Sequence, residues 1–198
     1  MIARVRGALH TLRLHRDLAA APPARPLSGP LEILTALTEN EQRCLADLAR
    51  GRVVLEVGAQ RGASTVAMAR EAELVHSVDW HRGDPDAGEG DTLLEYWRNL
   101  HAYGVRDRVV THIGDAAVVL PALRPRAFAG VFLDGCHEEA AVRRDLALIE
   151  PLVEPGGWFA FHDYGRFGVA PAVDEFVERS GGAMTLVNSV AVIGPPSR

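Results

Sequence analysis

The sequence predicts an α/β protein: a three-layer, Rossmann-like sandwich around a mostly parallel sheet of about seven strands. From residue 31 onward, short apolar runs alternate with segments of helical periodicity. This alternation indicates βαβ units, whose helices cover both faces of a parallel sheet. The C-terminal stretch differs, because only Asn188 and Ser189 separate "AMTLV" from "VAVIG". With no room for a helix between them, these two segments predict an antiparallel hairpin.

The predicted elements follow one another without an internal repeat. Thr38 and Glu41 come first, with the spacing of a capping box at a helix start. Strand–helix pairs are then expected at 52–57 and 63–72, 73–79 and 92–103, 108–113 and 116–123, 127–134 and 138–152, and 157–163 and 171–180.

Composition limits the class of protein. A chain of 198 residues with 47% hydrophobic and 24% charged residues is typical of a soluble globular domain. The net charge of −5 argues against a nucleic-acid partner, which would need a basic face. No apolar run approaches the roughly 20 residues of a membrane span. Two cysteines, Cys44 and Cys136, do not form a disulfide framework, so we expect a cytoplasmic location.

The N-terminal residues 1–30 are expected to be an appendage to a domain at 31–198. Charged residues such as Arg6 and Arg13 interrupt the apolar stretch that a signal peptide requires. Residues 1–20 instead predict an amphipathic helix, and the proline-rich stretch 21–30 a linker. This helix is expected to pack on the domain or on a second subunit of a homodimer, with membrane-surface binding as the alternative.

Each predicted parallel strand ends in a glycine or an acidic residue. The stretches concerned are "EVGAQRGAST", "VDWHRGD", "IGDAA", "LDGCH" and "FHDYGR". Singly, glycines turn chains and aspartates cap helices. Because ligands bind at the carboxyl ends of the strands in such sheets, five such ends together favour a ligand site.

The first strand end restricts the ligand. Gly58 and Gly62 enclose a short step from strand to helix, which lets a ligand approach the backbone. The stretch is not G-x-G-x-x-G and lacks the lysine of a P-loop, so a diphosphate is disfavoured. Glu56 would repel a phosphate and suits a cationic ligand instead.

The following strand ends favour a nucleoside. Asp79 is placed to accept hydrogen bonds from a ribose diol, as the second acidic residue of nucleotide-binding α/β folds does. Trp80 offers an apolar face to adenine, and Asp115 an acceptor for its amino group. S-adenosylmethionine combines a ribose, an adenine and a cationic amino-acid end without phosphate, and it satisfies these demands.

Two blocks of sequence resemble a known family. "VLEVGAQRGASTVAMAR" is similar to the first motif of class I S-adenosylmethionine-dependent methyltransferases, especially the catechol O-methyltransferase-like branch. "FLDGCHEEAAVRRDLALIEPLVEPGGWFAFHDY" resembles small bacterial methyltransferases, many of them attached to natural-product pathways. The resemblance covers about residues 53–176. It implies S-adenosylmethionine as methyl donor and the sheet order 3-2-1-4-5-7-6 with strand seven antiparallel.

The resemblance also assigns roles to matching positions. It places Glu56, Gly58, Gly62 and Ser64 in the donor loop and Asp79 at the ribose. The further matches are Asp115 for the adenine contact and Asp134 for the acid after the fourth strand, beside the cofactor.

The stretch "LDGCH" has three interpretations. In catechol O-methyltransferase-like enzymes the fourth-strand acid and an acid–amide pair hold Mg²⁺. The matching positions here are Asp134, Asp163 and Tyr164. Tyr164 stands in place of the amide, and tyrosine is a poor Mg²⁺ ligand. Asp134, His162 and Asp163 could still bind Mg²⁺ or another divalent cation. Alternatively, His137 is a metal-free general base, with Asp134 and His162 in the same catalytic set. The third interpretation makes Asp134 the cap of the helix expected at 138–152.

These observations predict O-methylation of a hydroxyl on a small, natural-product-like acceptor. The alternative is a nucleoside-binding protein on the same fold that does not methylate, since a fold does not determine a function. The polar set Asp134, His137, His162 and Asp163 favours the enzyme, because a mere binder does not need it at the donor's reactive end.

Overall fold

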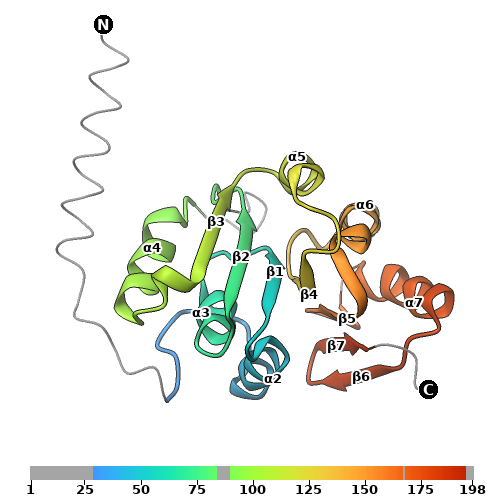
Figure 1. Cartoon of the computed structure of the whole chain (residues 1–198), viewed down its shortest axis with the longest axis horizontal. Coiled ribbons are helices and arrows are strands. Elements are labelled where there is room, and N and C mark those ends of the chain that lie inside the picture. Colours follow the sequence, from blue (N-terminus) through green and yellow to red (C-terminus); the bar gives the residue numbers. More distant parts are fainter. Residues whose placement is uncertain (1–28, 84–89, 167, 195–198) are drawn as a thin grey trace, which may run out of the picture.

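The computed structural model describes residues 29–83, 90–166 and 168–194 and shows one sheet between two helical layers (Figure 1). The strands of this sheet lie in the order β3-β2-β1-β4-β5-β7-β6. Strand β7 is antiparallel to both of its neighbours, and the other pairings are parallel. The predicted fold class, sheet order and hairpin are thereby confirmed. The helix predicted at residues 1–20 lies outside the described residues.

Every predicted strand–helix pair is present in the structure. The strands are β1 Val53–Val57, β2 Leu74–Asp79, β3 Val109–Ile113, β4 Phe128–Leu133, β5 Val153–Phe161, β6 Met184–Val187 and β7 Val190–Ile193. The α-helices are α2 Glu39–Ala49, α3 Ala63–Ala69, α4 Leu93–Ala102, α5 Ala116–Val119, α6 Glu139–Ile149 and α7 Val169–Ser180. Short 3₁₀ turns lie at Arg106–Arg108, Leu120–Ala122 and Glu150–Leu152.

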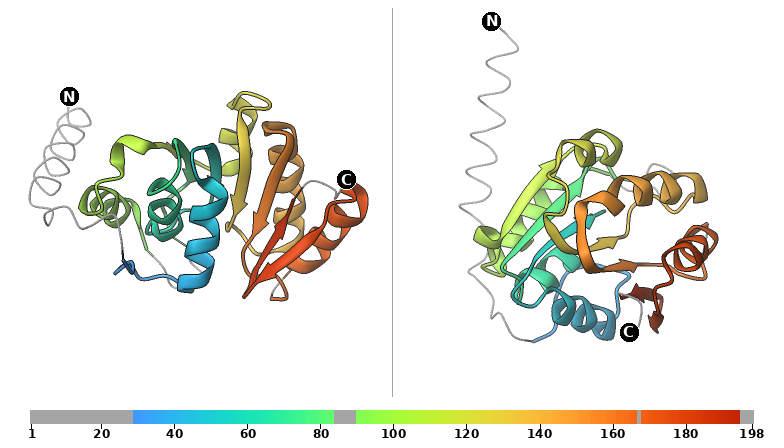
Figure 2. Two further views of the ribbon diagram at one scale, coloured as in Figure 1. Left: turned by 60° about the horizontal axis from the view of Figure 1, so that its bottom comes forward. Right: turned by 45° about the vertical axis from the view of Figure 1, so that its right-hand side comes forward.

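Two apolar cores lie on the two faces of the sheet. Helices α2, α3 and α4 cover one face, and α5, α6 and α7 cover the other (Figures 1 and 2). Because side chains alternate along a strand, Val54 of β1 packs into the first core while Leu55 packs into the second. This arrangement leaves the carboxyl ends of the parallel strands as the edge where loops from β1, β2, β4 and β5 meet. None of the described helices has the length and apolarity that a membrane crossing requires.

The predicted start of the fifth strand, residue 157, is wrong by four residues. Strand β5 already begins at Val153, which pairs with Phe128, and the register then shifts so that Trp158 pairs with Gly130. The stretch "EPGG" has the composition of a turn, but the sheet accommodates it as an irregularity inside the strand. Strands β4 and β5 end at Leu133 and Phe161, so Asp134 and Asp163 follow their strands instead of closing them.

Candidate active site

The loop between β1 and α3 depends on two glycines with left-handed backbone. Gly58 has φ +93°, and a Cβ atom there would lie 2.0 Å from the carbonyl oxygen of Asp134. Gly62, the N-cap of α3, has φ +85° and room for little more than a hydrogen beside the ring of Tyr96. At Gly58 only glycine both adopts the positive φ and leaves room for the Asp134 carbonyl, so the loop packs directly against the turn after β4.

Asp79 holds this loop in place. Its Oδ2 accepts hydrogen bonds from the backbone N–H groups of Ala59 and Gln60, both at 2.7 Å. Its Oδ1 accepts from the backbone N–H of His81 at 2.6 Å. The carboxylate thus fastens the β1–α3 loop to the end of β2. The ribose contact of Asp79 stays a prediction, and Trp80 beside it is 47% exposed, as a stacking surface for a base would be.

Two residues assigned to the donor loop are buried beneath it. Glu56 is fully buried, and its Oε2 accepts a hydrogen bond from Thr65 Oγ1 of α3 at 2.5 Å. Burial raises the pKa of Glu56 to about 7, while the hydroxyl groups of Ser64, Thr65 and Ser77 oppose the shift. Ser64 is only 4% exposed. Both residues therefore support the loop from within, and their direct contact with a cofactor stays a prediction.

Asp115 lies at the end of the next strand, where it caps α5. Its Oδ1 accepts a hydrogen bond from the backbone N–H of Ala117 at 2.8 Å. This is the ordinary role of an aspartate at a helix N-terminus. Its contact with adenine stays a prediction.

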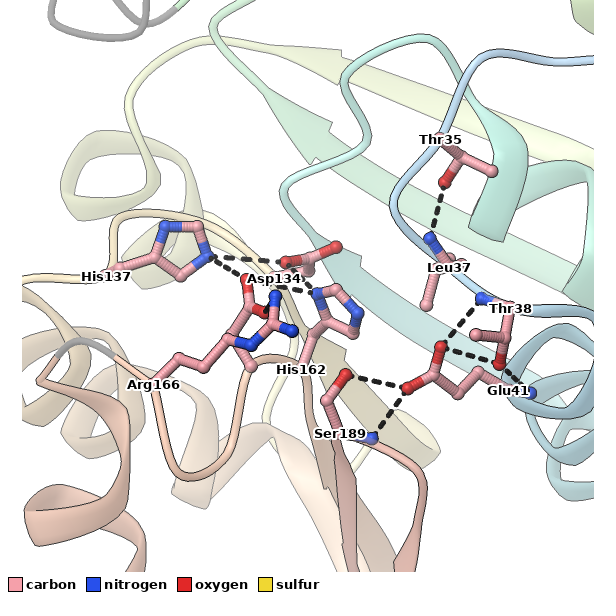
Figure 3. A network of polar contacts seen from close by, with 10 residues as sticks. Thr35, Leu37, Thr38, Glu41, Asp134, His137, His162, Arg166 and Ser189 are labelled. Carbon is pink, nitrogen blue, oxygen red and sulfur yellow. Dashed lines mark hydrogen bonds and ion pairs between the residues drawn. The ribbon is translucent and has the colours of Figure 1, made fainter.

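The structure brings together the polar side chains that follow β4 and β5 (Figure 3). His162 Nδ1 lies 3.1 Å from Asp134 Oδ1 and 3.4 Å from Asp163 Oδ2. His137 Nε2 lies 3.2 Å from Asp163 Oδ2 and 3.6 Å from Asp134 Oδ1. The two imidazoles thus lie between the two carboxylates, which would otherwise repel each other. We call Asp134, His137, His162 and Asp163 the polar cluster.

The carboxylates favour the protonated form of both histidines. The hydrogen bond to Asp134 raises the pKa of His137 against the effect of burial, and the charge of Asp163 adds to it. For His162, burial acts to lower the pKa, but the hydrogen bond to Asp134 and the charges of Asp134, Asp163 and Glu41 raise it above its ordinary value.

The helix-cap interpretation of Asp134 is wrong. Helix α6 begins at Glu139, and its N-cap is Glu138, whose side chain makes no capping hydrogen bond. The Asp134 carboxylate contacts the two imidazoles instead. Tyr164 also turns away from the polar cluster, since its hydroxyl donates to Asp174 of α7 at 2.8 Å.

Sequence reasoning missed two charged or titratable residues beside the site. Arg166 Nη1 lies 3.9 Å from Asp163 Oδ1 (Figure 3). His81 is buried, and its Nδ1 lies 3.0 Å from Thr92 Oγ1. Both residues belong to the strand-end stretches "FHDYGR" and "VDWHRGD", so their position in the sequence was a usable signal.

Solved structures with this fold include several enzymes. An O-methyltransferase of Streptomyces achromogenes, TomG, involved in tomaymycin synthesis and solved with S-adenosylmethionine, superposes with a TM-score of 0.64 at 19% identity, covering 82% of each chain. A Bacillus cereus O-methyltransferase in complex with S-adenosylhomocysteine has a TM-score of 0.62 at 16% identity, covering 93% of this chain and 89% of that one. A precorrin-8w decarboxylase of Methanobacterium thermoautotrophicum has a TM-score of 0.59 at 16% identity, covering 82% of this chain and 91% of that one. At these identities the likenesses establish the fold alone.

The family is established by the sequence match. The model of a methyltransferase domain family matches residues 55–164, more than half of the 198 residues. The matched range begins in β1, includes the β1–α3 loop and ends just after the polar cluster. The chain therefore belongs to this family of methyltransferase domains.

Proposed function

We propose that the protein transfers the methyl group of S-adenosylmethionine to a hydroxyl group of a small-molecule acceptor. The observation that carries this proposal is the contact between the two halves of the site. The glycine loop at the donor end packs on the carbonyl of Asp134, and the side chain of the same residue belongs to the polar cluster. A donor bound over the loop would present its methyl group beside residues that can activate a hydroxyl.

The assignment of S-adenosylmethionine as donor rests on the β1–α3 loop and on solved structures that share the fold. The β1–α3 loop, held by Asp79 and followed by the exposed ring of Trp80, offers backbone and an aromatic face without a phosphate-binding lysine. TomG and the Bacillus cereus enzyme, which share the fold, were solved with S-adenosylmethionine and S-adenosylhomocysteine. The same ligand for this chain follows by analogy.

In the proposed reaction the acceptor loses its proton to His137. The hydroxyl oxygen attacks the methyl carbon as the carbon–sulfur bond breaks, and S-adenosylhomocysteine leaves with the electron pair. Asp134 and Asp163 orient the imidazole and stabilise its cation once it holds the proton. Much of the rate enhancement would come from positioning, because the sulfonium donor is already activated.

The same residues fit a divalent cation. Asp134, His162 and Asp163 each offer one ligand atom, and these atoms all lie within 4.8 Å of one another. Two carboxylate oxygens and an imidazole nitrogen suit Mn²⁺, Fe²⁺ or Zn²⁺ better than Mg²⁺, which prefers oxygen ligands. A bound cation would supply Lewis acidity that lowers the pKa of the acceptor hydroxyl.

The donor is tested first, by calorimetric titration with S-adenosylhomocysteine. Binding in the micromolar range is expected, and its absence in the wild-type protein would overturn the proposal. Candidate acceptors are then screened by mass spectrometry for a product that is one methyl group heavier. Binding without transfer to any hydroxyl acceptor would favour the alternative, a nucleoside-binding protein on this fold.

Chelation separates the two mechanisms once an acceptor is known. If a cation is required, EDTA should abolish turnover, Mn²⁺ or Mg²⁺ should restore it, and Asp163→Ala should resemble the chelated enzyme. If His137 alone acts, EDTA should have no effect and His137→Ala should lower kcat by about 10²-fold or more. Asp107→Ala, at an exposed aspartate, is the matched control. Full activity of both site variants in EDTA would remove the polar cluster from the mechanism.

A further inference from the structure

Glu41 is a buried carboxylate that the proposed mechanism does not use. It lies in the first turn of α2 and is 1% exposed. Its Oε2 accepts hydrogen bonds from the backbone N–H and the hydroxyl of Thr38, at 2.7 and 2.9 Å. Its Oε1 accepts from the backbone N–H and the hydroxyl of Ser189, at 2.8 and 2.7 Å. A helix-capping residue thus also holds the β6–β7 turn, 148 positions away in sequence.

Ser189 connects this carboxylate to the polar cluster. While its N–H and hydroxyl donate to Glu41, its carbonyl oxygen accepts from the backbone N–H of Tyr164 at 2.9 Å. Tyr164 directly follows Asp163, whose φ of +53° lies in the left-handed region that non-glycine residues rarely adopt. Figure 3 shows Glu41 and Ser189 on the side of His162 that faces away from His137.

The strained backbone of Asp163 needs such support. A non-glycine residue keeps a left-handed conformation only where its surroundings impose it. The turn at Asp163 is held on one side by the Arg166 N–H, which donates to the Asp163 carbonyl at 2.9 Å, and on the other by the Ser189–Tyr164 bond. If the β6–β7 turn moves, Asp163 can relax and its carboxylate can leave His137.

We propose that Glu41 is a positioning residue for the acceptor end of the site: through Ser189 and Tyr164 it fixes the backbone of Asp163 and hence the direction of that carboxylate. This inference deepens the proposed function, because it concerns the same polar cluster. Glu41 does not touch the reacting groups, and the positioning effect proposed here passes through the β6–β7 turn.

The substitution Glu41→Gln tests this role with a side chain of nearly the same shape. Both carboxylate oxygens accept from a backbone N–H group, that of Thr38 on one side and that of Ser189 on the other. The amide of Glu41→Gln has only one oxygen, so in either orientation its NH₂ group faces a backbone N–H donor. Thr38→Ala is the matched control, since it weakens the same helix cap but leaves intact the two hydrogen bonds that Ser189 donates to Glu41.

The first experiment follows hydrogen exchange of the Tyr164 amide by mass spectrometry or NMR, with neither cofactor nor acceptor present. Glu41→Gln should speed its exchange by about tenfold or more, the loss expected when a bond to a charged group fails. Thr38→Ala should leave it within about twofold of the wild type. Unchanged exchange in Glu41→Gln, or the same acceleration in both variants, would overturn the proposal. Should Glu41→Gln fail to fold, Ser189→Ala, which removes one bond to Glu41, should still speed the exchange.

The second experiment separates turnover from cofactor binding. Glu41→Gln should lower kcat by about tenfold or more, because the misplaced carboxylate acts on the chemical step. Its affinity for S-adenosylhomocysteine should stay at the wild-type value, since the β1–α3 loop is held by Asp79. Thr38→Ala should match the wild type in both. If the wild type does not bind S-adenosylhomocysteine, the proposed function fails while the exchange experiment still decides the role of Glu41.

Discussion

Replacing Glu56 by glutamine should stabilise the protein at alkaline pH. The carboxyl group is fully buried on β1 and accepts a hydrogen bond from Thr65. Burial raises its pKa from 4.5 to about 7, against the opposing effect of nearby hydroxyl groups. Glutamine has nearly the same shape, can accept the bond from Thr65, and does not ionise. The substitution therefore removes the cost of a buried charge and little else.

The size of the effect follows from linkage. The pKa of Glu56 in the folded protein, about 7, lies above its unfolded value of 4.5, so the native state binds the proton more tightly. The stability that this proton contributes is complete below pH 4.5 and is lost as pH rises through 7. At about 1.4 kcal/mol per pKa unit, the ionised group costs about 3 kcal/mol at pH 8. For a domain of this size that corresponds to a rise in Tm of about 6–12 °C in the variant.

Urea denaturation of the wild type and Glu56→Gln at pH 5 and pH 8 tests this reasoning. The variant should be the more stable protein at pH 8, and the difference should shrink to about 1 kcal/mol or less at pH 5. Glu73→Gln, at an exposed position, removes the same formal charge and should show neither effect. A variant that is less stable than the wild type at pH 8, or a difference independent of pH, would refute the assignment of Glu56 as a costly buried acid.

Three further predictions concern the loops and the edge of the sheet. Asp79→Asn should weaken S-adenosylhomocysteine binding by about tenfold or more in calorimetry. The asparagine amide has one oxygen, so its NH₂ group must face a backbone N–H of either the β1–α3 loop or His81. Wild-type affinity in the variant would contradict this prediction. Gly58→Ala should lower the free energy of unfolding in urea by about 3 kcal/mol or more, because its Cβ would lie 2.0 Å from the Asp134 carbonyl oxygen. The control Gly51→Ala, with φ +64° but nothing within 4 Å, should lower it by about 1 kcal/mol. Equal losses in the two variants would argue against close packing at Gly58. His76 Nδ1 and His112 Nε2 lie 3.1 Å apart, and burial lowers the pKa of both imidazoles. Their contribution to stability is therefore complete above pH 6.5 and is lost as pH falls through their folded pKa values. His112→Gln should lose less stability than the wild type between pH 7 and pH 5, and an identical loss would exclude the histidine pair as the cause.

The sequence predicted the sheet well because its signals are local. Alternation of strands and helices, the capping box of Thr38 and the two-residue hairpin turn each depend on neighbouring residues. The start of β5 was missed because Gly156 and Gly157 have the composition of a turn, while the pairings on either side of them, Val153 with Phe128 and Trp158 with Gly130, involve β4. No local pattern reports a register shift between strands.

The candidate site was predicted in part, because some of its contacts join segments that are far apart in the sequence. The polar cluster was found because the carboxyl ends of adjacent parallel strands must meet. The clamping role of Asp79 was not found, because its partners depend on how the β1–α3 loop folds back over β2. The link from Glu41 to Ser189 spans 148 positions and has no signature in either stretch.

Backbone strain among the described residues gathers at the candidate site. Five described non-glycine residues have positive φ: Gln60, His81, Arg126, Asp163 and Asn188. Three of them, Gln60, His81 and Asp163, follow the parallel strands β1, β2 and β5 at the candidate site. The three at the strand ends share a form of support. Asp79 accepts the N–H groups of Gln60 and His81, and the carbonyl of Ser189, itself fixed by Glu41, accepts the N–H that follows Asp163.

Two carboxylates thus hold the two ends of the site, and a double variant can show whether they act separately. Asp79 and Glu41 have no bonding partner in common among the contacts described above, so the losses of stability in Asp79→Asn and Glu41→Gln should add to within about 0.5 kcal/mol. Their effects on function should differ in kind, with Asp79→Asn reducing cofactor affinity and Glu41→Gln reducing kcat. The two loops meet at Asp134, whose carbonyl packs on Gly58 and whose carboxylate contacts His162. A coupling energy above about 1 kcal/mol in the double-mutant cycle would show that Asp134 transmits strain between the loops, and would contradict independent support of the donor and acceptor ends.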